Sequence, residues 1–247
     1  MQVNFIRHEK KYLVTKEQAE VFKGILSQYM KPDKHGEYLV QNIYFDNENW
    51  DVIRTSIEKP LYKEKMRLRC YGIPNKESRV FLELKKKYKG MVYKRRDVIT
   101  HDDLLFNSAL EITTQERSQI FRELNFYMRK TQVTEKIYIA YKRTAFNGIE
   151  HKDLRVTFDA DICFRLDNLD FLDPNYGTLL LPKDKIVMEI KTLGGMPVWM
   201  AQALSEHKIY PAPFSKYGRC YTGFILKQPD IRTKINPQII MEGKLSA

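Results

Sequence analysis

The chain has 247 residues and a formal net charge of +11, with 42 lysines and arginines against 31 aspartates and glutamates. The apolar fraction of 43% excludes a disordered chain, and no apolar run approaches the roughly 18 residues of a membrane span. The positive excess predicts a polyanionic partner, which could be nucleic acid, anionic lipid or a phosphorylated small molecule. Three widely spaced cysteines and a start without signal-peptide character lead us to expect reduced thiols in a cytoplasmic protein.

Strand-like alternation dominates the chain and is interrupted by helical segments. In chain order, the periodicity predicts strand 4–14, helix 16–30, strands 37–47, 63–72, 78–88 and 90–100, helical segment 101–130, strands 136–146, 154–165 and 184–192, helix 197–207 and a loop at 211–221. Thr15 and Gln18 have the spacing of a capping box that starts the first helix, and Lys89-Gly90 is typical of a tight turn. No repeat or linker divides the sequence, so we expect a single domain, residues 1–247.

At least five of these strands carry apolar side chains on one face and charged side chains on the other, because successive side chains in a strand alternate sides. In the run "EKMRLRCYG", Lys65, Arg67 and Arg69 lie opposite the apolar side chains. One interpretation is a half-buried antiparallel sheet whose polar face meets water. The other closes the sheet into a barrel with helices outside and a cation-lined lumen. The dominance of Arg and Lys favours the lumen, which a polyphosphate could fill.

At these residues the sequence resembles a known family, the VTC-type polyphosphate polymerase domain of the triphosphate tunnel (CYTH-like) metalloenzyme superfamily. The resemblance is carried by "RHEKKYLV", "KEKMRLRCYG", "FLELKKKYKGMVYKRR", "YKRTAF", "LRVTFDADI", "VMEIKT" and "PFSKYGR". It implies an α+β fold with a closed antiparallel β-barrel of about eight strands, a cation-lined tunnel and helices packed outside. It also implies a divalent metal, Mn²⁺ or Mg²⁺, and transfer of the γ-phosphoryl group of ATP to a growing inorganic polyphosphate chain.

The charged faces and the resemblance together select the candidate site residues. The candidates for catalysis are Lys11, Arg67, Arg69, Lys85 and Glu189. The candidates for phosphate binding are Arg7, Lys65, Lys87, Lys94, Arg96, Arg143, Arg155, Lys191 and Lys216. The resemblance implies Glu189 and Glu9 as metal ligands, Glu9 being the second Glu of the family's E-x-E-x-K signature. Arg7 replaces the first Glu of that signature, which moves the site away from triphosphate hydrolases with several acidic metal ligands.

Phosphoryl transfer requires positioning and charge neutralisation with little covalent chemistry from the protein. A terminal phosphate of the acceptor chain is already an anion and requires no general base, in agreement with the absence of Walker A, H-E-x-x-H and G-x-S-x-G motifs. The carboxylates have simpler alternative roles: Glu9 and Glu83 as salt-bridge partners, Asp159 as a solvated group and Asp161 as a structural one.

Three functional alternatives stay open. Two are a triphosphatase or cyclase of the same superfamily and a non-catalytic polyphosphate-binding barrel. The third, a nucleic-acid-binding barrel, is disfavoured because carboxylates share the cationic faces. The expected partners are therefore ATP and inorganic polyphosphate and not nucleic acid. We expect no membrane segment within the chain, and a partner protein stays an open possibility.

Overall fold

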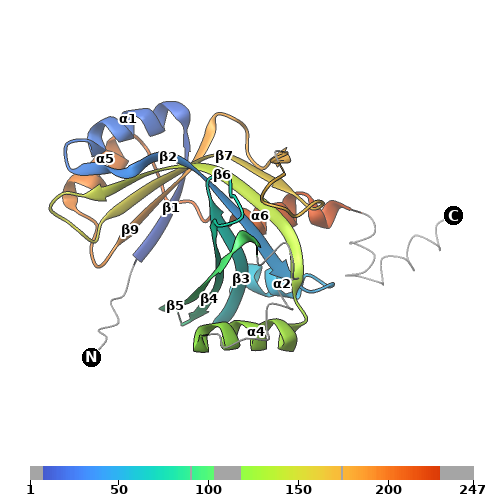
Figure 1. Cartoon of the computed structure of the whole chain (residues 1–247). Helices are drawn as coiled ribbons and strands as arrows, with labels where there is room; N and C mark the ends of the chain where they lie inside the picture. Colours follow the sequence, from blue (N-terminus) through green and yellow to red (C-terminus); the bar gives the residue numbers. More distant parts are fainter. Residues whose placement is uncertain (1–7, 90, 103–117, 174, 229–247) are drawn as a thin grey trace, which may run out of the picture.

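One curled antiparallel sheet dominates the computed structural model, which describes residues 8–89, 91–102, 118–173 and 175–228 (Figure 1). The strands are β1 (His8–Thr15), β2 (Met30–Asp46), β3 (Tyr62–Tyr71), β4 (Arg79–Tyr88), β5 (Met91–Thr100), β6 (Thr134–Gly148), β7 (Arg155–Arg165), β8 (Thr178–Leu179) and β9 (Lys185–Thr192). Their order across the sheet is β1-β9-β7-β6-β2-β3-β4-β5, and the short β8 pairs with β7. The predicted α+β class and antiparallel pairing are confirmed.

The helices lie between and after the strands. They are α1 (Lys16–Leu26), α2 (Asp51–Ile57), α4 (Gln119–Thr131), α5 (Val198–Glu206) and α6 (Lys216–Gly223). The predicted capping box is confirmed, since the Thr15 hydroxyl accepts from the Gln18 amide and the Gln18 side chain accepts from the Thr15 amide. The first helix ends before residue 30, because β2 begins there. Of the helical segment predicted over 101–130, residues 103–117 lie outside the described residues. No helix in the described ranges is both long and apolar enough to cross a bilayer.

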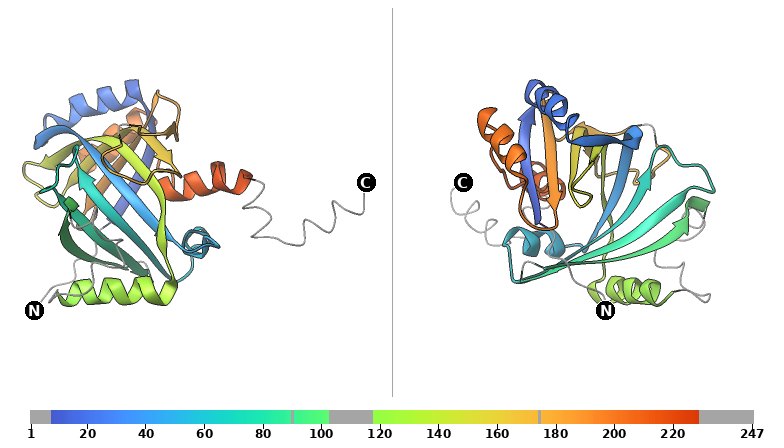
Figure 2. Two further views of the ribbon diagram at one scale, coloured as in Figure 1. Left: turned by 45° about the vertical axis from the view of Figure 1, so that its right-hand side comes forward. Right: turned by 90° about the vertical axis from the view of Figure 1, so that its left-hand side faces the viewer.

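The apolar strand faces pack outward against helices, as the alternation predicts. We call this side of the sheet the outer face. On β1, β7 and β9, residues such as Tyr12 and Met188 pack with Phe22 of α1 and residues of α5. On β3 and β4, residues such as Met66 pack with Leu124 of α4 and its neighbours. These two buried clusters hold α1 and α5 over one half of the sheet and α4 over the other (Figures 1 and 2). The charged side chains that alternate with these apolar residues therefore lie on the opposite side of the sheet, which we call the inner face.

The predicted closure of the barrel is wrong for the described part of the chain. β1 and β5 end the hydrogen-bonded order and do not pair with each other there. The connection across the opening is made by side chains, with the Lys85 ammonium of β4 lying 3.7 Å from the Glu9 carboxylate of β1. Because charged side chains bridge this gap, the two halves approach each other without backbone hydrogen bonds.

The expectation that every helix lies outside the sheet is also wrong, because α6 packs against the inner face. A third buried cluster joins Tyr217 and Tyr221 of α6 to inner-face residues that include Val40, Ile139 and Val187. At this end the inner positions are apolar, so they bury a helix instead of facing water. The loop predicted at 211–221 therefore contains the start of α6. Its glycines have low helix propensity, which concealed it in the sequence.

The short helix α2 was also absent from the sequence prediction. Its first backbone amides are satisfied by Asp46, a fully buried carboxylate at the end of β2 that accepts from the amides of Val52 and Ile53 at 2.9 Å. Asp46 also accepts the Tyr217 hydroxyl at 2.6 Å. One buried carboxylate thus fixes α2 and anchors α6 to it.

Candidate functional site

One cluster of cations on the inner face is built around Glu83, whose side chain is almost fully buried on β4. Arg67 of β3 and Arg96 of β5 are its direct cross-strand neighbours. Arg67 donates from Nε at 2.9 Å, Arg96 from Nε at 2.6 Å and Lys94 from Nζ at 2.6 Å. Burial alone would raise the pKa of Glu83, but the surrounding cations, Arg67 first, outweigh it and hold that pKa well below its ordinary value. Glu83 is thus an ionised salt-bridge partner.

A second cluster surrounds Asp159 on β7. Arg143 of β6 binds this carboxylate with both ends of its guanidinium, at 2.6 and 2.8 Å, and Lys216 of α6 reaches it at 2.5 Å. Burial would raise the pKa of Asp159, but Lys216 and Arg143 lower it well below its ordinary range. Asp159 has no exposed surface, so its predicted solvated role is wrong. Asp161 instead pairs with Lys142 at 3.1 Å, compatible with the structural role predicted for it.

A third group joins β1 to β9, where Lys11 lies opposite Glu189 and Glu9 lies opposite Lys191. Lys191 Nζ lies 2.5 Å from Glu189, and Lys11 Nζ lies 3.2 Å from Glu9 and donates to the Phe214 carbonyl. Burial would raise the pKa of Glu9, but Lys85, Lys11 and Lys191 outweigh it and lower the pKa to about 2. Burial would lower the pKa of Lys11, but Glu189 and Glu9 outweigh it and raise that pKa above its ordinary value. Both partners are therefore charged at neutral pH.

Two lysines on the inner face have few counter-charges. Lys65 and Lys85 lie opposite each other on β3 and β4, and Lys65 Nζ is 3.3 Å from the Ser215 hydroxyl at the start of α6. Burial, together with repulsion from Lys63, Lys11 and Lys85, lowers the pKa of Lys65 to about 7. Burial and the cations around it lower the pKa of Lys85 as well. A bound polyanion would relieve this repulsion.

Arg69 is held by neutral groups that the sequence analysis did not identify. Arg69 is 7% exposed, and its guanidinium donates to the Asn42 side chain at 2.9 Å and to the Tyr141 hydroxyl at 3.4 Å. Burial would raise the pKa of Tyr141, but Arg143 and Arg69 outweigh it and lower the pKa to about 8. The phenol thus lies among cations. The alternation of 37–47 places Asn42 and Tyr44 on one face, which was the available signal for these residues.

Three predicted phosphate-binding residues lie away from these groups or outside the described chain. Arg155 extends to Asp33, with 3.0 Å between the guanidinium and the carboxylate. Lys87 is exposed near the end of β4, opposite Lys63. Arg7 lies outside the described residues. The other predicted cations lie together in the groups described above, whereas Arg155 and Lys87 lie apart from them.

The inner face offers a small set of oxygen donors for a divalent metal. Across the described ranges, no three His, Cys, Asp or Glu side chains come together as one ligand group. Glu9 and Glu189 do share the inner face of adjacent strands. The buried Thr157 hydroxyl lies opposite Glu189 and has no hydrogen-bond partner among the described residues. These oxygen donors fit Mg²⁺ or Mn²⁺, which uses one or two carboxylates and completes its shell with phosphate oxygens and water.

The inner face as a whole therefore carries more cations than carboxylates. The cations are Lys11, Lys65, Arg67, Arg69, Lys85, Lys94, Arg96, Arg143, Lys191 and Lys216. The carboxylates that pair with these cations are Glu9, Glu83, Asp159 and Glu189, and Asp46 adds a fifth beside α6. Cations from several strands and from α6 thus gather on the inner face of one curled sheet, an arrangement whose charge suits a polyanionic ligand.

Comparison with known proteins identifies the family to which the chain belongs. Residues 6–225 match the sequence model of the VTC domain, so the chain belongs to the VTC domain family. Among solved structures it is similar to HpAC1 from Hippeastrum, an adenylyl cyclase candidate described as having a dominant triphosphatase activity. The two sequences are 16% identical, the match covers 87% of this chain and 95% of that chain, and the TM-score is 0.51. It is also similar to the PH1819 protein from Pyrococcus horikoshii, with 16% identity, 93% and 99% of the two chains covered, and a TM-score of 0.46. At these identities the likeness concerns the fold. The family predicted from the sequence motifs is confirmed.

Proposed function

We propose that this chain is a polyphosphate polymerase that transfers the γ-phosphoryl group of ATP to the end of a growing inorganic polyphosphate chain. The observation that carries the proposal is the excess of cations over carboxylates on the inner face, together with the weakly compensated pair Lys65 and Lys85. A linear polyanion supplies the negative charge that this face lacks. The VTC domain family supports a tunnel enzyme, and the polymer as product is our inference.

In this proposal the arginines position the phosphates. Arg67 and Arg69 lie on one strand face and present planar forks of donors, which suit phosphate oxygens. Both are pre-oriented, Arg67 by Glu83 and Arg69 by Asn42, so little side-chain freedom is lost when substrate binds. Lys216 adds a cation from α6, where its ammonium is bound to Asp159 of β7.

The transfer step needs no general base from the protein. A terminal phosphate oxygen of the acceptor forms a bond to the γ-phosphorus while the bond from that phosphorus to the β–γ bridging oxygen breaks, and ADP leaves with that oxygen. The lysines and arginines hold both anions in line and neutralise their charge. Lys11 on β1 and Lys85 on β4 lie on the two sides of the opening of the sheet. In this position they would contact both the triphosphate of ATP and the acceptor polyphosphate.

Glu189 and Glu9, with the Thr157 hydroxyl near Glu189, are the residues that would hold Mg²⁺ or Mn²⁺. A bound divalent cation would neutralise charge on the phosphate oxygens that these carboxylates alone would repel. The lowered pKa of Glu9, which Lys85, Lys11 and Lys191 produce against the effect of burial, keeps that carboxylate ionised and able to act as a ligand at neutral pH.

Hydrolysis is the competing reaction, since HpAC1 shares the fold and is described with triphosphatase activity. Purified protein incubated with ATP and Mn²⁺ or Mg²⁺ should produce a polymer that migrates as long polyphosphate on a gel and disappears when EDTA is present. Release of inorganic phosphate without polymer would assign the chain to the triphosphatases instead.

A further inference from the structure

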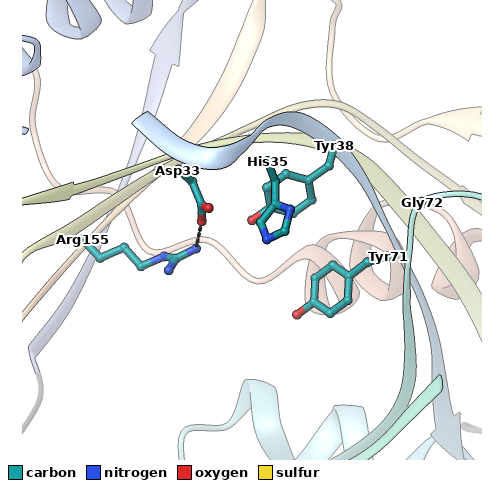
Figure 3. Close-up of a pocket in the computed structure, with 6 residues that line it drawn as sticks. All are labelled: Asp33, His35, Tyr38, Tyr71, Gly72 and Arg155. Carbon is teal, nitrogen blue, oxygen red and sulfur yellow. Dashed lines mark hydrogen bonds and ion pairs between the residues drawn. The ribbon is translucent and has the colours of Figure 1, made fainter. Parts of the chain in front are cut away.

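A cavity of about 560 Å³ opens beside the cation clusters and has a different chemistry from theirs (Figure 3). Its lining residues come from the first half of β2, the end of β3 and the start of β7. They are Asp33, His35, Tyr38, Tyr71, Gly72 and Arg155. A volume of this size is in the range of small-molecule sites, which are about 300–1,000 Å³.

This cavity continues the inner face. Tyr38 on β2 lies directly opposite Arg143 on β6. Tyr71 follows Arg69 by two residues on the same face of β3, and the Arg69 guanidinium carbon lies 5.9 Å from the centre of the Tyr71 ring. A ligand that fills the cavity would therefore reach the phosphate-binding arginines without leaving the protein surface.

The lining does not suit a bare polyphosphate chain. The cation in the cavity, Arg155, is already paired with Asp33 at 3.0 Å, and Figure 3 shows this ion pair at one side of the space. The remaining wall is aromatic: His35 and Tyr38 have ring centres 6.0 Å apart, and Tyr38 and Tyr71 have ring centres 6.1 Å apart. Flat, exposed rings beside a carboxylate match a flat heterocycle that has an amino group or hydroxyls to donate.

We propose that this cavity, named here the aromatic mouth, binds the nucleoside of the phosphoryl donor. The base lies against Tyr71 and His35, Asp33 accepts from the amino group or the ribose hydroxyls, and the triphosphate runs past Arg143 to Arg69. The inference rests on the proposed function, because it takes ATP as the donor. It adds a means by which the site distinguishes a nucleoside triphosphate from the inorganic chain that occupies the same lumen.

The test compares ATP with inorganic tripolyphosphate, which has the phosphates but no nucleoside. Tyr88 provides a matched control for Tyr71: they are 43% and 40% exposed, and the Tyr88 ring pairs with Tyr62 at 6.4 Å on the other face of the sheet. Titration calorimetry at one pH and salt concentration should show Tyr71→Leu weakening ATP about tenfold, as expected for the loss of a base-stacking ring. Tripolyphosphate affinity should change less than about twofold, and Tyr88→Leu should affect neither ligand.

The outcomes separate this inference from the proposed function. If wild-type protein binds both ligands but Tyr71→Leu leaves ATP affinity unchanged, or weakens both ligands equally, the aromatic mouth is not a nucleoside site while the polymerase proposal stands. If wild-type protein binds neither ligand, both proposals are wrong. His35→Ala, which changes an exposed side chain, serves as a second variant if Tyr71→Leu does not fold, and the same ATP-selective loss is expected.

Discussion

Two neighbouring lysines on β4 give the sharpest test of the inner face. Lys85 and Lys86 have the same chemistry and contribute equally to net charge, but they point to opposite sides of the sheet. Lys85 lies 3.7 Å from Glu9 across the opening, and Lys86 lies 3.4 Å from Glu64 on the outer face. A diffuse basic surface would lose similar affinity for a polyanion when either lysine is replaced by alanine.

A lumen predicts unequal losses. A charge-assisted hydrogen bond from lysine to phosphate contributes about 1.5–3 kcal/mol. Because the Lys85 side chain is 49% exposed, solvent screening places its contribution near the lower end, about 1.5 kcal/mol or roughly tenfold in affinity. Lys86→Ala removes a part-exposed ion pair with Glu64 on the outer face, away from the bound polyanion, so its polyphosphate affinity should change by no more than about 0.5 kcal/mol, roughly twofold.

The assay is calorimetric titration of both variants with polyphosphate of one defined length, at one pH and one salt concentration. The fixed salt concentration matters because the long-range effect of removing one charge is screened by ions and is the same for both variants. Equal losses, or a larger loss for Lys86→Ala, would show that polyphosphate does not follow the inner face.

Further predictions concern the metal, pH and stability. Glu189→Gln should lower the polymerisation rate by about 100-fold or more while changing polyphosphate affinity only slightly, since metal-ion stabilisation is worth several kcal/mol; a normal rate would exclude Glu189 as a metal ligand. The pKa of Lys65 is lowered to about 7 in the folded protein without ligand. Between about pH 7 and the ordinary lysine pKa, the unfolded chain therefore binds more protons at this residue than the folded protein does. The contribution of Lys65 to the free energy of unfolding should accordingly increase as pH rises through this window. A polyanion raises that pKa again, so binding should take up a proton and weaken with rising pH in this window; calorimetry in buffers of different ionisation enthalpy should detect the uptake in wild type but not in Lys65→Arg. Asp46→Asn should lower the free energy of unfolding by about 2 kcal/mol in urea, because Asp46 accepts from Tyr217 and from backbone amides of α2, whereas the same change at the exposed Asp51 should have little effect.

Strand alternation predicted which face the cations of β3 and β4 occupy, because a period of two follows from strand geometry alone. Lys65, Arg67 and Arg69 lie on the inner face, and Met66 and Leu68 lie under α4, as the sequence predicts. The family also followed from local motifs. These features depend only on neighbouring residues, so one sequence was sufficient to find them.

Features that depend on contacts between distant segments were not predicted. The bidentate partner of Arg143 is Asp159, and it is found only when the register of β6 and β7 is known. The inner position of α6 depends on the apolar residues that β2, β6 and β9 place at one end of the inner face. Neutral ligands of the arginines, such as Asn42, carry no charge signal in the sequence. The opening between β1 and β5 likewise depends on how far the whole sheet curls.

Transfer of the γ-phosphoryl group to polyphosphate is the central claim, and a labelled donor tests it most directly. Protein is incubated with ATP labelled in the γ-phosphate, a divalent metal and a polyphosphate primer of defined length, and the products are separated by length. The account predicts label in chains longer than the primer, with unlabelled ADP formed in equal amount. Label found only in inorganic phosphate, with the primer unchanged in length, would contradict it.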